Sequence, residues 1–245
     1  MLTKSINFKN YRLKKNNIKI KKDFKVLIKE NNIIIRSLSP SYKNNYKKKL
    51  ISKLKKNKNY KLIGMGGSIL GSESIYDFLK HKIKKNFYFY NNLCPTINID
   101  KKEKSINLII SKSGNTLETI ANTNLILKKK QENIFITENK KSYLFSLATE
   151  LKSEIVHHNN FIGGRYSVLS EVGMLPAELM GLDSKKFKQM NNLIKNNKFI
   201  DALTRNVSNT LFFLKQKKFN SIILNYDKNS ENLFNWYQQL VAESL

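Results

Sequence analysis

Apolar residues in this chain gather in short runs, and polar segments of helical length separate them. Such runs are typical of strands that are buried on both faces of a sheet. The runs lie at 62–63, 87–90, 106–110, 133–137 and 154–157. The segments between them, 117–129 and 143–151 among others, have apolar residues at helical spacing. This alternation predicts an α/β fold of three layers, a parallel sheet with helices on both faces.

The flanking regions have a different pattern. Residues 1–45 are rich in lysine and asparagine, with one strand-like run at 33–35, and we expect them to form an arm. The segment 46–56 has its apolar residues on one face, which predicts an amphipathic helix with lysines outside. Further helices are expected at 184–196 and 201–217.

The last part of the chain predicts a second strand–helix unit. Residues 219–225 (FNSIILN) are typical of a buried strand, and 231–245 have the spacing of a helix. Since this unit has no sheet of its own to join, the sequence looks cut off. The expected divisions are an arm (1–45), a first α/β domain (46–183), a helical connection (184–218) and the start of a second domain (219–245).

A polar loop follows the apolar run at 106–110. It consists of Ser111, Lys112, Ser113, Gly114, Asn115 and Thr116. The loop lies between the carboxyl end of a predicted strand and the N-terminus of a predicted helix. Free backbone N–H groups and the positive end of the helix dipole meet there, which suits a phosphate group. A plain Ser/Thr helix cap is the alternative, but three hydroxyls with a lysine and a glycine favour a phosphate site.

A glycine-rich segment, GMGGSILG at 64–71, follows the first apolar run. Glycines at this place let a ligand approach the backbone without interference from a Cβ atom. The spacing differs from the G-x-G-x-x-G of dinucleotide-binding proteins, so the segment alone does not indicate a cofactor.

A second glycine turn, GGRYS at 163–167, carries an arginine. Arg165 is suited either to neutralise negative charge beside a phosphate pocket or to satisfy backbone carbonyls. Ser167 is expected to cap a following helix. Neighbouring strand residues point to opposite faces, so His157 and His158 are a poor metal pair, and we expect structural roles for them.

Composition changes this picture little. The formal net charge is +27, but only four of the 45 basic residues are arginine. Arginine is the residue that forms bidentate hydrogen bonds with phosphates and bases. The lysines are spread along the chain, so we expect no specific nucleic-acid partner. Cys94 is the single cysteine and fits a reducing compartment. The basic N-terminus lacks the apolar core of a signal peptide, and no run approaches the ~20 apolar residues of a membrane span. We therefore expect a cytoplasmic protein without a membrane partner.

Four segments together resemble the phosphoglucose isomerase (glucose-6-phosphate isomerase) family, part of the sugar isomerase (SIS) superfamily with its flavodoxin-like fold. They are GMGGSILG at 64–71, SKSGNTLET at 111–119, GGRYS at 163–167 and WYQQLVAESL at 236–245. They occur in the family's order, and the resemblance covers roughly residues 50–245.

The resemblance implies a sugar-phosphate site. By this comparison the loop hydroxyls and the backbone at Lys112 hold the 6-phosphate, in agreement with the interpretation from the loop itself, and the glycine turns contact the sugar. The implied binding residues are Gly67, Ser68, Ser111, Lys112, Ser113, Thr116 and Gly164.

The resemblance also implies the reaction, interconversion of glucose 6-phosphate and fructose 6-phosphate in glycolysis and gluconeogenesis. The residue matching Glu243 moves a proton between C2 and C1, and the residue matching Arg165 stabilises negative charge on the enediol. A carboxylate base and a fixed cation suit that chemistry. No metal or other cofactor is implied. For Glu243 the alternative is a buried helix with one exposed acid at its end.

The match has a large departure. The family's second domain continues well beyond the position of Glu243, where it supplies a His and a Lys associated with ring opening and a Gln near the substrate. The Gly-Lys that usually follows the AES motif is also absent. The sequence therefore supports an isomerase, which we expect to be a homodimer at full length. The alternative is a non-catalytic sugar-phosphate-binding module or an inactive fragment.

Overall fold

The computed structural model describes residues 18–30, 32–93, 104–128 and 131–244. Contacts divide the chain into two compact units. The sheet unit comprises residues 42–187 and 225–245, and the helical unit comprises residues 1–41 and 188–224. Cys94, much of the expected arm and Leu245 lie outside the described residues.

The sheet unit is built on five parallel strands in the order β2-β1-β3-β4-β5. The strands are β1 (Asn59–Gly64), β2 (Asn86–Tyr90), β3 (Ser105–Ile110), β4 (Asn133–Thr137) and β5 (Glu154–His157). Its α-helices are α3 (Lys48–Leu54), α4 (Leu70–Phe78), α5 (Leu117–Ile126), α6 (Tyr143–Glu150), α7 (Glu171–Leu179) and α10 (Glu231–Ala242). Its 3-10 helices are η1 (Gly66–Ser68), η2 (Lys80–Lys82), η3 (Gly164–Leu169), η4 (Ser184–Lys186) and η5 (Lys228–Ser230). Every predicted strand from residue 62 to residue 157 is confirmed.

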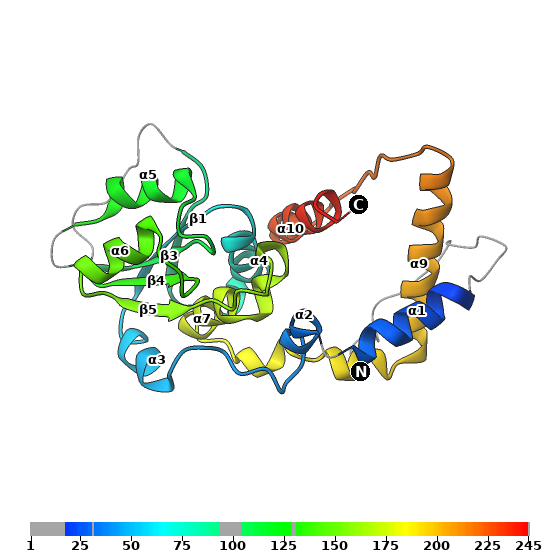
Figure 1. Ribbon diagram of the computed structural model, residues 1–245, viewed down its shortest axis with the longest axis horizontal. Coiled ribbons are helices and arrows are strands. Elements are labelled where there is room, and N and C mark those ends of the chain that lie inside the picture. The colour runs from blue at the N-terminus through cyan, green and yellow to red at the C-terminus, as the bar shows by residue number, and fades with distance from the viewer. Residues whose placement is uncertain (1–17, 31, 94–103, 129–130, 245) are drawn as a thin grey trace. The chain divides into compact units, whose positions relative to one another are not determined.

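Helices lie on both sides of this sheet (Figure 1), and an apolar cluster fills the space on each side. Along β3, Leu108 and Ile110 pack into the cluster that includes residues of α3, α4 and α7, whereas Ile109 packs into the cluster with α5 and α6. The alternation follows from the strand period of two, and because both faces are covered, the strand is apolar at nearly every position. The three-layer α/β sandwich is thereby confirmed.

The helical unit contains α1 (Ile18–Lys29), α2 (Ile33–Ser37), α8 (Met190–Ile194) and α9 (Asn197–Lys215). The expected strand at 33–35 is wrong: these residues begin α2, and the side chain of Asn32 accepts a hydrogen bond from the backbone N–H of Ile34 at its start. The expected helix over 184–196 is also interrupted. The range contains the short elements η4 and α8 in place of one helix. Asn196 then begins α9, because its side chain accepts a hydrogen bond from the backbone N–H of Phe199.

The expected buried strand at 219–225 is wrong as well. These residues have no regular secondary structure, and their apolar side chains are exposed, with Ile222 at 85%. A strand exists only through hydrogen bonds to a neighbour, and no strand in the described ranges lies beside this run. Helix α10 is confirmed and packs on α4 (Figure 1). The domain divisions expected from the sequence stay predictions.

Within the described ranges, no helix combines the length and the apolar character that crossing a membrane would require.

Candidate active site

The strand order places a topological switch point between β1 and β3. The chain leaves β1 through α4 toward β2 on one side, and leaves β3 through α5 toward β4 on the other. Open parallel sheets bind ligands in the crevice beyond the carboxyl ends of two such strands. Gly64 and Ile110, the last residues of the two strands, are paired in register. The glycine turn and the polar loop therefore begin side by side.

The polar loop 111–116 is fixed by its own hydrogen bonds. Gly114 has φ +67°, and a Cβ atom there would lie 2.1 Å from Ser142 Oγ, so only glycine fits. The N–H of Gly114 donates to Ser111 Oγ (3.2 Å), which is also 3.0 Å from Thr116 Oγ1. The side chain of Asn115 accepts from the N–H of Tyr143 (2.9 Å) and ties the loop to α6.

The loop leads into α5 without a side-chain cap. Thr116 is the N-cap residue, but its hydroxyl turns to Ser111 and makes no capping hydrogen bond. Ser111 is buried, whereas Ser113 is exposed. Thr119, in the first turn of α5, has a buried hydroxyl that has no hydrogen-bond partner in the described part of the chain. The plain-cap alternative thus does not describe this helix start, and its N–H groups remain suited to an anion.

The two glycine turns touch. A Cβ atom on Gly67 would lie 2.2 Å from the carbonyl carbon of Gly164, so the contact requires glycine. Ser167 does not cap a helix as expected: it lies within η3, and its hydroxyl donates to Gly164 O (2.7 Å) and Gly67 O (3.2 Å). Ser170 is the residue that precedes α7. The serine of GGRYS therefore joins the two turns.

The contact brings Arg165 to the end of α10. Its Nη1 lies 3.2 Å from Glu243 Oε2, and its Nε donates to Ser244 Oγ (3.1 Å). Both side chains of the ion pair remain partly exposed, at 28% and 47%, so the pair contributes little to stability. Seventy-eight positions of sequence separate these two charged groups. Their meeting places a cation and a carboxylate beside the glycine turns.

Helix α10 is anchored by polar contacts along its length. Trp236 Nε1 donates to the carbonyl of Arg165 (3.0 Å), and Ser74 Oγ of α4 donates to the carbonyl of Asn232 (2.7 Å). Near its end, Gln239 Nε2 donates to Glu243 Oε1 (2.9 Å). These bonds fix the carboxylate of Glu243 relative to the Arg165 turn.

Tyr166 adds to the electrostatics at Arg165. Its hydrogen bonds to Ser244 and to Arg165 lower the pKa of the Tyr166 hydroxyl, and a hydrogen bond with Tyr166 raises the pKa of Arg165. The guanidinium also lies 4.6 Å from the Tyr166 ring centre. The site therefore stabilises a permanent positive charge at this point.

The chain is similar to known proteins over most of its length. The profile of the phosphoglucose isomerase family matches residues 52–245. The chain belongs to the phosphoglucose isomerase family. The resemblance seen in the four sequence segments is thereby confirmed.

Relatives within the phosphoglucose isomerase family are longer than this chain. Glucose-6-phosphate isomerase of Methanocaldococcus jannaschii is 36% identical over 205 residues, which are 76% of this chain and 50% of that protein. The enzyme of that name from Mycoplasmopsis synoviae is 33% identical over 213 residues, 75% of this chain and 48% of that protein. The chain spans about half the length of these curated relatives.

A solved structure supports the fold independently. The crystal structure of a hypothetical protein from Thermus thermophilus has a TM-score of 0.69 and 20% sequence identity to this chain. The match covers 93% of this chain and 59% of that one.

The structure thus brings together the sequence-predicted residues of this phosphoglucose isomerase family member at one edge of the sheet. Three further residues at the candidate site were not predicted from the local sequence pattern: Thr119, Tyr166 and Ser244. For Thr119 a pattern was present: its hydroxyl recurs three residues after Thr116, on the same helical turn. Nothing local marked Tyr166 and Ser244, because they meet only through the folding of α10 onto the glycine turn.

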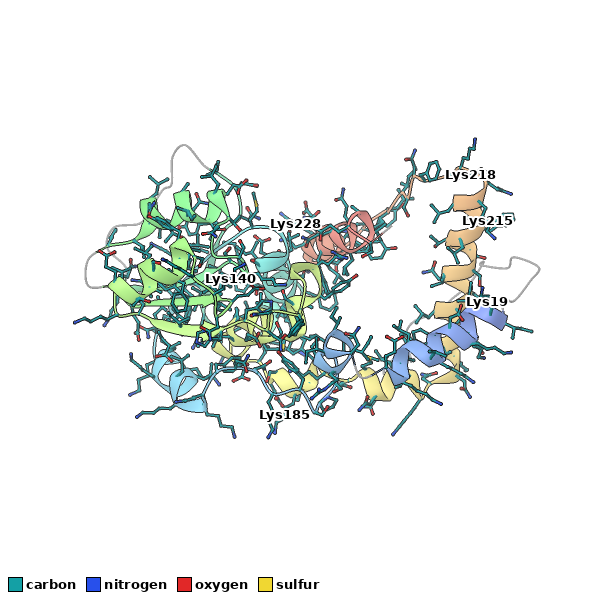
Figure 2. All side chains as sticks on the ribbon, in the orientation of Figure 1. Lys19, Lys140, Lys185, Lys215, Lys218 and Lys228 are labelled. Atoms are coloured by element: carbon teal, nitrogen blue, oxygen red, sulfur yellow. The ribbon has the colours of Figure 1, made fainter. Side chains whose placement is uncertain are left out.

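Exposed lysines occur in both units. Six of them are labelled in Figure 2: Lys19, Lys140, Lys185, Lys215, Lys218 and Lys228. Their spread agrees with the interpretation of the net charge as general composition. That the chain has no specific nucleic-acid partner stays a prediction.

Proposed function

We propose that this chain forms the sugar-phosphate-binding and proton-transfer part of a glucose-6-phosphate isomerase. The observation that carries the proposal is the ion pair of Arg165 and Glu243 (3.2 Å) beside the contact of Gly67 with Gly164. A base and a cation at one place, next to an anion-binding helix start, suit an aldose–ketose isomerisation.

In this proposal the 6-phosphate lies at the start of α5. It accepts hydrogen bonds from the backbone at Lys112 and from the hydroxyls of Ser113 and Thr116, while the buried Ser111 holds the loop in shape. The unpartnered hydroxyl of Thr119 adds a further donor. The sugar then extends over the backbone of Gly67, Ser68 and Gly164.

Glu243 is the proposed base. It removes the proton from C2 of the open-chain aldose and returns it to C1, while the hydroxyl proton on O2 passes to O1. A carbonyl thus forms at C2 and no external reactant is consumed. Arg165 stabilises the negative oxygen of the enediol between the two steps. Gln239, through its hydrogen bond to Glu243, holds the carboxylate in place.

A second function has its own support. Because the chain spans about half the length of its curated relatives, a sugar-phosphate-binding module without catalysis fits the same site. A coupled assay for fructose 6-phosphate, run on this chain, separates the two. Turnover that falls about 10²–10⁴-fold in Glu243→Gln, with affinity little changed, supports catalysis by Glu243. Binding of glucose 6-phosphate without turnover supports the module.

Calorimetric titration tests the phosphate site itself. We expect Thr116→Ala to weaken binding of glucose 6-phosphate by about 1.5–3 kcal/mol, the contribution of a hydrogen bond to a charged group. Thr149→Ala is the matched control, since that exposed threonine on α6 bonds only its own helix, at the carbonyl of Phe145. Equal losses for glucose and glucose 6-phosphate in Thr116→Ala would remove the phosphate from this loop.

The family also leads us to propose a cytoplasmic setting and a homodimer of the full-length protein. Size measurement of such a protein by light scattering checks the dimer.

A further inference from the structure

A buried imidazole contacts the residues that flank the segment 163–170, called here the Arg165 turn. His158, just after β5, is 3.0 Å from the carbonyl oxygen of Ile162 through Nε2 and 2.9 Å from Glu171 Oε1 through Nδ1. The side chains of His158 and Glu171 are 1% and 0% exposed. Ile162 directly precedes Gly163, and Glu171 directly follows Ser170. One side chain thus closes the segment 163–170, which carries Gly164 and Arg165.

The hydrogen bonds define how many protons the imidazole carries. A backbone carbonyl accepts only, so Nε2 must hold a hydrogen. Glu171 Oε1 already accepts from the N–H of Asn159 (2.8 Å), and Oε2 accepts from the hydroxyl of Tyr42 (3.1 Å). The hydrogen bonds from His158 and from the N–H of Asn159 lower the pKa of Glu171, so its carboxyl group is ionised and Nδ1 donates to it as well. The pair is therefore an imidazolium and a carboxylate, buried together.

We propose that His158 and Glu171 are positioning residues: their buried ion pair holds the turn that carries Arg165 against Gly67. The effect on the turn is independent of any ligand, whereas the effect on sugar-phosphate recognition rests on the proposed function. Neither residue touches the site itself, so both act through the backbone of 163–170.

The neighbouring groups favour this charge state. Burial alone would raise the pKa of Glu171, but the hydrogen bonds from His158 and from the N–H of Asn159 hold it below its ordinary value. The carboxylate therefore persists as the pH falls, until the solution passes that lowered pKa. Burial and the charge of Glu171 raise the pKa of Tyr42, and burial and Glu178 raise that of Tyr46. The two phenols that face Glu171 and Glu178 thus stay neutral donors.

The chain contains a matched control for this pair. His157 is the preceding residue, points to the other side and is exposed. Loss of its imidazole removes the same chemical group from the same place in the sequence without touching the Arg165 turn.

The first measurement is a long-range ¹H–¹⁵N spectrum of the imidazoles of the full chain between pH 5 and 9, assigned with His157→Asn and His158→Asn. We expect both nitrogens of His158 to carry hydrogens at pH 7, because both lie at hydrogen-bond distance from acceptor oxygens. A single neutral tautomer of His158 at pH 7 would overturn the proposed charge state.

The second measurement is amide hydrogen exchange of residues 162–170. We expect exchange at least about tenfold faster in His158→Asn than in His157→Asn. Should His158→Asn fail to fold, Glu171→Gln gives the answer, because it removes the charge of the partner and keeps the shape of the side chain. Protection of residues 162–170 equal to that in His157→Asn would overturn the hold.

The third measurement separates this inference from the proposed function. The probes are 6-phosphogluconate, which carries a carboxylate at C1, and glucitol 6-phosphate, which is neutral there. The quantity measured is the ratio of the affinity for 6-phosphogluconate to the affinity for glucitol 6-phosphate. We expect this ratio to fall about tenfold in His158→Asn and to stay unchanged in His157→Asn. If both probes bind and the preference stays unchanged, the positioning role for recognition is wrong. If neither binds although the first two results hold, the proposed function fails while the hold on the turn stands.

Discussion

The sheet unit and the helical unit use their apolar residues in opposite ways. In the sheet unit every residue of β3 is buried, and apolar clusters cover both faces of the sheet. In the helical unit α1 buries no residue, and α9 buries only Ile200, Thr204 and Asn209. Side chains such as Phe219 and Ile222 stand exposed at 70% and 85%.

The comparison teaches that apolar content alone does not make a core. Strand β3 and the run at 219–225 are about equally apolar, but only β3 has strands on both sides. Stability and the candidate site therefore belong to the sheet unit.

The largest effect is expected from a matched pair of leucines. Leu108 in β3 is fully buried, and Leu211 in α9 is 41% exposed. We expect Leu108→Ala to lower the free energy of unfolding by about 2–5 kcal/mol, because it leaves a cavity between covered layers. Leu211→Ala should cost under about 1 kcal/mol. Urea unfolding followed by circular dichroism measures both, and similar losses would erase the distinction between the units.

The next effect concerns the polar loop of the sheet unit. Gly114 and Gly181 both have positive φ, but only at Gly114 would a Cβ atom meet a neighbour, Ser142. Gly114→Ala should therefore cost more than the ~1–2 kcal/mol of left-handed strain alone and abolish glucose 6-phosphate binding. Gly181→Ala should show the strain and keep binding. Loss of binding in both variants would mean that general destabilisation, and not the loop, is responsible.

A smaller effect depends on pH. Glu73 in α4 is buried, and burial raises its pKa despite a hydrogen bond from Asn91. An acid with a raised folded pKa stabilises the fold below its unfolded pKa and loses that contribution as pH rises through the folded value. Glu73→Gln should thus raise the melting temperature more at pH 8 than at pH 5, by less than the two changes above. Glu150→Gln, at an exposed acid, is the control and should show no such trend.

The smallest effect belongs to the helical unit. Lys21 and Asp201 join α1 and α9 through an ion pair of 2.7 Å with side chains about half exposed, at 45% and 46%. A double-mutant cycle with Lys21→Met and Asp201→Asn should give about 0.2–1 kcal/mol, falling as salt is added. A larger, salt-independent coupling would show that this unit has a buried polar core after all.

The sequence predicted the sheet well because parallel strands covered on both faces must be apolar at nearly every position. It failed at 33–35, where the cap from Asn32 starts a helix, and at 219–225, where a strand requires a neighbour that local pattern cannot supply.

The site divides in the same way. The shape of the polar loop was readable from Ser111, Gly114 and Thr116, because it depends on residues close in sequence. The meeting of Arg165 with Glu243 was implied only by family resemblance. Nothing in the spacing predicted the buried pair of His158 and Glu171, since it depends on where α7 returns to the end of β5.

The most direct test of the central claim is a titration of the chain with glucose 6-phosphate, followed by amide chemical shifts. If the site lies at the switch point of the sheet, the shifts should concentrate at 66–68, 112–119, 163–166 and 239–244. Shifts scattered over the exposed lysines, in the helical unit as much as in the sheet unit, would show attraction of phosphate to charge alone and would contradict the account.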